Sequence, residues 1–117
     1  MRLTDLTCLN GFGVNIGFDY SFRVTIQEDF TGRTFFFKVK SSKVDTAFLI
    51  ELTNSVDSSV SGVFFTDPTL GIVDILIKAA DSAAIEPQNA VYELYYTTLT
   101  SKVILFEGSL QFSSGVI

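Results

Sequence analysis

The chemistry open to this chain is narrow, because the sequence holds no histidine and a single cysteine, Cys8. Without histidine, the sequence supplies no Ser-His-Asp or Cys-His nucleophile, no imidazole base and no imidazole ligand for zinc. One cysteine forms no internal disulfide. We expect Cys8 to be a small apolar residue of a first strand rather than a reactive thiol.

Carboxylates are the remaining candidates, either as a catalytic pair for glycoside hydrolysis or as calcium ligands. The carboxylates considered are Glu28, Asp29, Glu51, Asp67, Asp74, Glu93 and Glu107. Most stand at expected strand ends or on the polar side of a strand, where turn capping and solvation account for them. The oxygen-rich loops at residues 54–59 and 67–69 lack the spacing of an EF-type loop. We therefore expect no enzyme activity, no metal and no cofactor.

A glycine-rich segment, NGFGVNIG at residues 10–17, looks superficially like a phosphate-binding loop. Such loops join a strand to a helix, whereas a strongly alternating strand follows here. We expect a flexible elbow instead, between an N-terminal arm at residues 1–12 and the rest of the domain.

Alternation of apolar and polar side chains predicts strands along most of the chain. The expected strand segments are FDYSFRVTI, TFFFKVK, AFLIEL, VSGVFFTD, GIVDILIK, VYELYYTT and SKVILFEGSLQF. Turn residues at 29–32 and the polar link TLTSK connect neighbouring strands, and Gly108 suggests a bulge or a close backbone approach. Asp81 could cap a single helical turn that runs to Ile85 and ends before Pro87.

Seven or eight short strands with almost no helix predict an all-β, two-sheet sandwich that fills residues 1–117 as one domain. A closed barrel is the alternative. Within the sandwich, Phe35 and Phe37 would face the core, with Val39 on the same face of their strand. In a later strand, Phe48, Ile50 and Leu52 would share one face, opposite Leu49 and Glu51.

Several strands carry large apolar side chains on both faces, although a sandwich covers only its inner faces. We expect outside cover over Phe36, one of Phe64 or Phe65, Tyr95, and one of Ile104 or Phe106. Phe36, Phe65 and Tyr95, with Lys38 and Lys40 beside Phe36, are the predicted interface residues. The cover could come from the N-terminal arm or from a neighbouring subunit.

Composition narrows the choice of partner. The formal net charge is −5, which argues against nucleic acid, since phosphate binding needs a basic face. No signal-peptide core and no apolar run of about 18 residues is visible, so we expect synthesis in a cytoplasm and no membrane insertion. A mean hydropathy of +0.38 and 12 phenylalanines indicate a surface that a protein partner covers.

The order of these signals resembles the immunoglobulin-like domains of bacteriophage tail and baseplate proteins, including the N-terminal type of baseplate upper proteins. FTGRTFFFKVK, residues 30–40, is similar to their D-x-T-G-x-x-F-x-x-x-(V/I)-(K/R) opening. Their closing half is matched by residues 82–85, Pro87, Tyr92, Leu94, Leu105, Gly108, Leu110 and Phe112. The resemblance covers residues 18–117. It departs where PQNAVY lacks the usual glycine and where Glu93 replaces the usual aspartate.

The resemblance implies an immunoglobulin-like sandwich of seven or eight antiparallel strands that serves as a structural part of a virion. Such domains attach fibres or receptor-binding proteins to a tail, and they carry no catalytic residues. The expected partners are other virion proteins and a second copy of the chain. Two alternatives stay open: a head decoration (cement) protein, and a module that binds host-surface sugars weakly through Tyr92, Tyr95 and Tyr96.

Overall fold

Eight strands and two single helical turns make up the computed structural model, which describes residues 12–25, 28–57 and 59–114. The strands are β1 (Phe12–Ile16), β2 (Tyr20–Thr25), β3 (Thr34–Lys40), β4 (Ile50–Thr53), β5 (Gly62–Asp67), β6 (Ile72–Ile77), β7 (Gln88–Thr97) and β8 (Lys102–Ser114). A 3-10 turn, η1 (Pro68–Leu70), follows β5, and a helical turn, α1 (Ala79–Ser82), follows β6.

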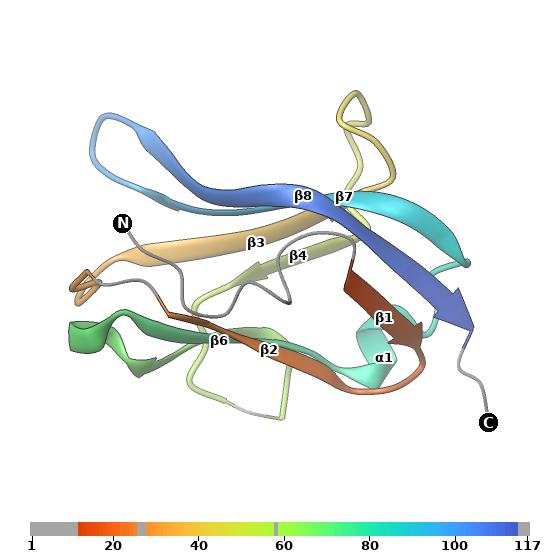
Figure 1. Cartoon of the computed structure of the whole chain (residues 1–117), viewed down its shortest axis with the longest axis horizontal. Helices are drawn as coiled ribbons and strands as arrows, with labels where there is room; N and C mark the ends of the chain where they lie inside the picture. The colour runs from red at the N-terminus through yellow and green to blue at the C-terminus, as the bar shows by residue number, and fades with distance from the viewer. Residues whose placement is uncertain (1–11, 26–27, 58, 115–117) are drawn as a thin grey trace.

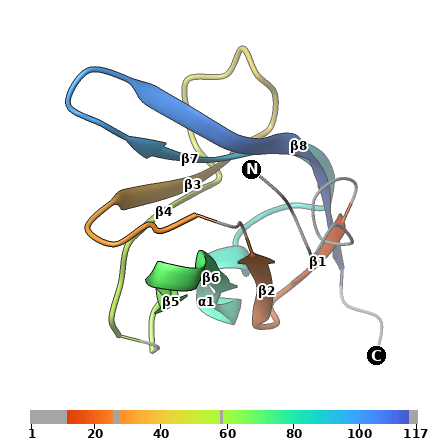
Figure 2. The ribbon, with the colours of Figure 1, turned by 60° about the vertical axis from the view of Figure 1, so that its left-hand side comes forward.

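The strands form two facing sheets, as the two views in Figures 1 and 2 show. One sheet has five strands in the order β1-β8-β7-β3-β4, and the other has three in the order β2-β6-β5. The predicted two-sheet sandwich is confirmed, and a closed barrel is not formed. Every strand pairing is antiparallel except that of β1, which runs parallel to β8.

Strand β1 corrects the prediction of a flexible elbow. Residues 12–16 pair with β8 in register from Phe12 opposite Leu110 to Ile16 opposite Ser114. Val14 is fully buried, and burial of this side chain favours the strand despite the glycines around it. Gly17 then turns the chain at φ +83°, and its N–H donates to Ser82 Oγ over 3.0 Å. The remainder of the predicted arm, residues 1–11 with Cys8, lies outside the described residues.

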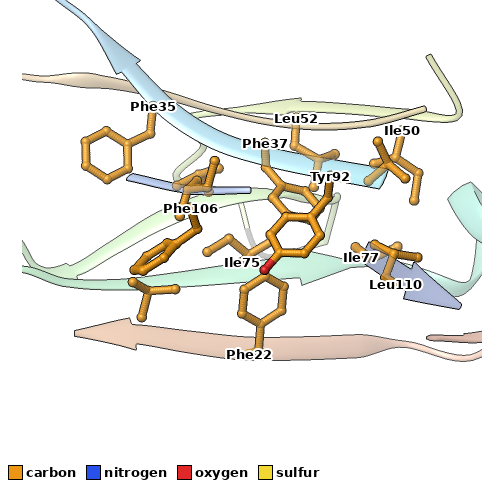
Figure 3. Close-up of a cluster of buried hydrophobic side chains, with 14 of the residues drawn as sticks. Phe22, Phe35, Phe37, Ile50, Leu52, Ile75, Ile77, Tyr92, Phe106 and Leu110 are labelled. Carbon is orange, nitrogen blue, oxygen red and sulfur yellow. The ribbon is translucent and has the colours of Figure 1, made fainter. Parts of the chain in front are cut away.

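The core lies between the sheets and is rich in aromatic rings (Figure 3). Phe22 of β2 meets Phe37 of β3 across the sandwich, with ring centroids 5.6 Å apart in an edge-on arrangement. Val73, Ile75 and Ile77 of β6 are fully buried, as the alternation of that strand predicted. The edge-on aromatic pair adds about 1 kcal/mol beyond the apolar area that it buries.

Two local predictions were wrong. Gly108 pairs regularly with Tyr92, and the bulge lies at Leu105, where Leu94 faces Phe106 but Tyr95 faces Ile104. The bulge turns both Leu105 and Phe106 into buried positions, each 9% exposed.

The helical turn α1 is also capped differently from the prediction. Asp81 lies inside the turn and accepts a hydrogen bond from Ser61 Oγ rather than capping α1. The first free N–H, that of Ala79, donates to Asp19 Oδ1 over 2.8 Å. Asp19 lies 60 residues earlier in the chain, so local sequence spacing could not reveal this cap.

Candidate functional site

The outer face of the five-stranded sheet gathers aromatic and charged side chains in cross-strand rows. Phe36 of β3 faces Tyr95 of β7, and Tyr95 faces Ile104 of β8. The neighbouring row on the same face consists of Glu51, Lys38, Glu93 and Glu107, one from each of β4, β3, β7 and β8. We call this surface, with Phe48, Lys40, Lys43 and Lys102 beside it, the aromatic–lysine face.

Phe36 and Tyr95 form the centre of the aromatic–lysine face. Their rings stack with centroids 5.1 Å apart and planes inclined by 23°. Phe36 is half-buried, and Tyr95 is only 7% exposed although it points away from the core. Part of the cover that Phe36 needs therefore comes from its own sheet.

Lysine side chains pack over these rings. Lys38 Nζ lies 4.8 Å from the Phe48 ring centroid and 5.5 Å from that of Phe36. Lys102 Nζ lies 4.3 Å from the Tyr95 centroid, and Lys40 Nζ lies 4.9 Å from that of Phe48. An ammonium over an aromatic face is attracted by the ring quadrupole, which holds each lysine in place.

Two carboxylates complete the arrangement. Glu51 Oε2 lies 3.6 Å from Lys38 Nζ, and Glu93 forms an ion pair with Lys102. A hydrogen bond with the Tyr95 hydroxyl raises the pKa of Lys38, burial opposes this, and the Glu51 carboxylate adds to the rise. Lys38 is therefore a firmly charged ammonium held among rings.

An open cavity of about 310 Å³ lies in this face. Its lining includes Lys38, Lys40, Lys43, Lys102, Phe48 and Tyr95. The cavity combines an apolar wall with several cations, a composition that suits recognition rather than proton transfer.

Four of the five predicted interface residues come together here, namely Phe36, Lys38, Lys40 and Tyr95. Phe65 does not. Its ring packs against Phe35 at 5.2 Å and adds to the core, so Phe64 is the outward residue of β5. A bulge follows Phe65 in β5, between Phe65 and Asp67, and the alternation of the sequence did not predict it.

Phe48 does not share a face with Ile50 and Leu52, although alternation predicted that it would. It precedes β4, is 40% exposed and lies against Lys38 and Lys40, whereas Leu49 packs against the core. The strand begins at Ile50, so strict alternation could not be extended back to Phe48.

Lys102 and Ile104 also belong to the face, and Ile104 is 45% exposed. Of the pair Ile104 and Phe106, Ile104 is therefore the outward residue. The β7–β8 register that brings both residues beside Tyr95 depends on the Leu105 bulge. The sequence alone did not fix that register.

The three tyrosines considered for sugar binding do not form one exposed platform. Tyr92 and Tyr96 are 4% and 7% exposed and belong to the core cluster. Tyr96 stacks on Phe35 with centroids 5.6 Å apart. Only Tyr95 reaches the outer face.

The outer face of the three-stranded sheet carries a different arrangement. Arg23 and Asp74 face each other in register, with Nε to Oδ1 at 2.8 Å and Nη2 to Oδ2 at 3.1 Å. Thr66 Oγ1 donates to the same carboxylate. Burial alone would raise the pKa of Asp74, but the hydrogen bonds from Arg23 and Thr66 outweigh it and hold the pKa below its usual value.

The described residues form neither a metal-binding cluster nor a membrane-spanning helix. Within residues 12–25, 28–57 and 59–114, no three Asp, Glu or Cys side chains come close enough to hold a metal ion. No helix in this same part of the chain is long and apolar enough to cross a membrane.

The architecture is shared with known immunoglobulin domains. A crystal structure of the RIG-5 IG1 homodimer superposes with a TM-score of 0.54 at 14% identity over 95% of both chains. The fold is immunoglobulin-like. The NK cell receptor Nkp44 gives a TM-score of 0.55 at 12% identity, covering 92% of this chain and 98% of that one.

A longer match shows the same fold. The ectodomain of the teleost fish polymeric Ig receptor gives a TM-score of 0.56 at 12% identity, and the match covers 97% of this chain but 50% of the receptor chain. No protein-family model matches the sequence, and no curated protein sequence matches it.

The immunoglobulin-like fold here is built without an inter-sheet disulfide between described residues. In antibody domains, a disulfide joins a strand of one sheet to a strand of the other. A buried tryptophan packs against this disulfide. In this chain Phe22 of β2, Phe37 of β3 and Tyr92 of β7 converge between the sheets (Figure 3). Aromatic packing thus replaces the covalent link.

Proposed function

We propose that this domain is a non-enzymatic module that binds other proteins through the aromatic–lysine face. The observation that carries the proposal is the row of Phe36, Tyr95 and Ile104 on the outside of the five-stranded sheet. Enrichment in aromatic residues is typical of the core of a protein interface. Immunoglobulin-like domains also often mediate protein contacts, and the RIG-5 IG1 structure is a homodimer.

The proposed setting is the virion of a bacteriophage, in a tail, a baseplate or a fibre attachment. This part rests on the resemblance of residues 18–117 to phage immunoglobulin-like domains. The partners would be other virion proteins and a second copy of the chain. Mass spectrometry of purified phage particles tests whether the chain is part of the virion. If the chain is found only in heads from which the tails have been removed, it would be assigned to head decoration instead.

The interface is tested with Ile104→Asp, because Ile104 is 45% exposed and its replacement leaves the core intact. We expect the variant to fold with unchanged circular dichroism and to lose self-association or particle incorporation by at least tenfold. Phe64→Asp, on the other outer face, is the matched control and should associate normally. The proposal would be contradicted if the wild-type protein is monomeric in analytical ultracentrifugation and the Ile104→Asp variant is incorporated into particles as well as the wild type.

A further inference from the structure

The lysines of this acidic protein are concentrated in one place. The sequence has five lysines and a net charge of −5. Four of the five, Lys38, Lys40, Lys43 and Lys102, line the cavity of about 310 Å³ on the aromatic–lysine face. The fifth, Lys78, forms an ion pair with Asp19 at 3.4 Å, outside this cavity. Such clustering against the overall charge creates a local positive potential.

Carboxylates of the chain neutralise this cluster only in part. Glu93 and Glu107 are the acidic residues of the lining, and Glu93 pairs with Lys102. Glu51 pairs with Lys38 from outside the lining. Lys40 and Lys43 form no ion pair with any residue that the structure describes. Two ammonium groups are thus available to an external anion.

The walls between these lysines are apolar. Val91, Phe48 and Tyr95 contribute to the lining. Phe48 holds Lys40 Nζ at 4.9 Å from its ring, which restricts the motion of that side chain before any ligand arrives. An anion entering here would be partly removed from water, where its attraction to an ammonium group is stronger.

We infer that this cavity receives a carboxylate from an acidic segment of a partner protein. The inference rests on the proposed function and adds the chemistry of the partner. A lysine ammonium group acts as a point charge and can bind a carboxylate without a fixed geometry. The volume, at the lower end of ordinary ligand pockets, suits one or two side chains.

Polyanions fit this cavity less well. Nucleic acid would require a long basic face along its backbone, whereas these lysines share the lining of one cavity with Glu93 and Glu107, and no arginine is in that lining. The two glutamates leave only a small excess of positive charge, which suits a single carboxylate better than the many closely spaced charges of a sulfated polysaccharide. A peptide carrying an acidic side chain beside an aromatic one matches both the lysines and the Phe48–Tyr95 wall.

The experiment uses the complete chain and a fluorescein-labelled peptide of sequence Gly-Glu-Phe-Glu-Gly, followed by fluorescence anisotropy at low salt. We expect the peptide to bind at least tenfold more tightly than its counterpart with glutamine in place of glutamate. The double variant Lys40→Gln/Lys43→Gln should weaken binding at least tenfold. Lys78→Gln removes one lysine charge outside the cavity and should have no effect.

Three outcomes would overturn the inference: equal binding of the two peptides, an equal effect of Lys78→Gln, or lysine-dependent binding of a heparin oligosaccharide without binding of the glutamate peptide. The last would identify an anionic sugar rather than a protein. Self-association is measured separately, by the Ile104→Asp variant. A failed peptide experiment with an intact Ile104-dependent association would therefore reject only the partner chemistry.

Discussion

The outer faces of the two sheets use similar residues in different arrangements. On the three-stranded sheet, Arg23 and Asp74 face each other and form a bidentate ion pair, with Thr66 donating to the same carboxylate. On the five-stranded sheet, ammonium groups lie over aromatic rings, and among the described residues only Lys38 and Lys102 of these lysines also meet carboxylates.

This difference separates a face whose charged groups pair with each other from the face at which the proposed function places a partner. A bidentate guanidinium–carboxylate pair engages both carboxylate oxygens and two of the five guanidinium N–H donors. An ammonium over a ring keeps its donors available, because the ring accepts no conventional hydrogen bond. The charged groups of the three-stranded face therefore pair with each other. Those of the five-stranded face lie over aromatic rings and, on the function proposed above, remain available together with apolar area for a partner.

The largest expected effect concerns the aromatic centre. Tyr95→Ala removes the ring that stacks on Phe36 and lies under Lys102, and we expect it to lower the free energy of unfolding by about 3 kcal/mol. Phe64→Ala, at the half-buried position on the other face, should cost about 1 kcal/mol. Urea denaturation measures both. Tyr95→Phe keeps the ring and serves as the control, and equal losses for Tyr95→Ala and Phe64→Ala would remove the distinction between the faces.

A smaller effect concerns the charged centre of the three-stranded face. Asp74→Ala removes the acceptor for Arg23 and Thr66, and we expect a loss of about 1 kcal/mol, reduced by solvent screening of the partly exposed pair. Glu51→Ala removes the partner of Lys38 on the other face and should cost less, because the Phe48 and Tyr95 rings still hold that lysine. Thermal unfolding compares the two, and a larger loss for Glu51→Ala would reverse the assignment.

The sequence predicted the sandwich because alternation is strong wherever a strand has one buried face. TFFFKVK is the clearest case, with Phe35, Phe37 and Val39 fully buried and Phe36 on the outside. The same reasoning missed β1, since glycines flank its buried residue Val14. A parallel pairing with the last strand also depends on contacts between the two ends of the described chain.

The candidate site could be predicted only in part, because its composition depends on register. Phe36, Lys38 and Lys40 follow from one strand, but Lys102 and Ile104 join them through the Leu105 bulge. Phe65 was placed outward because VFF offers two phenylalanines and alternation cannot choose between them without a partner strand. Pairing with Val73 of β6 decides the choice and turns Phe65 inward.

The smallest expected effects are changes of stability with pH. The three-stranded face should lose stability at low pH, and the five-stranded face should lose it at high pH. The lowered pKa of Asp74 means that its contribution to stability is full above its unfolded pKa of about 3.9 and is lost as pH falls through the lower folded pKa. The raised pKa of Lys38 means that its contribution is full below about 10.4 and is lost as pH rises through the higher folded pKa.

We therefore expect the stability difference between wild type and Asp74→Asn to shrink below about pH 4, and that between wild type and Lys38→Met to shrink above about pH 10.5. Thermal unfolding measured from pH 2 to pH 11 checks both. A difference for Asp74→Asn that stays constant down to pH 2 would show that the Arg23 pair contributes no charge-dependent stability. The two faces would then no longer differ in how their charged groups contribute to stability. The Arg23–Asp74 pair would no longer explain why the proposed partner binds the five-stranded sheet rather than the three-stranded sheet.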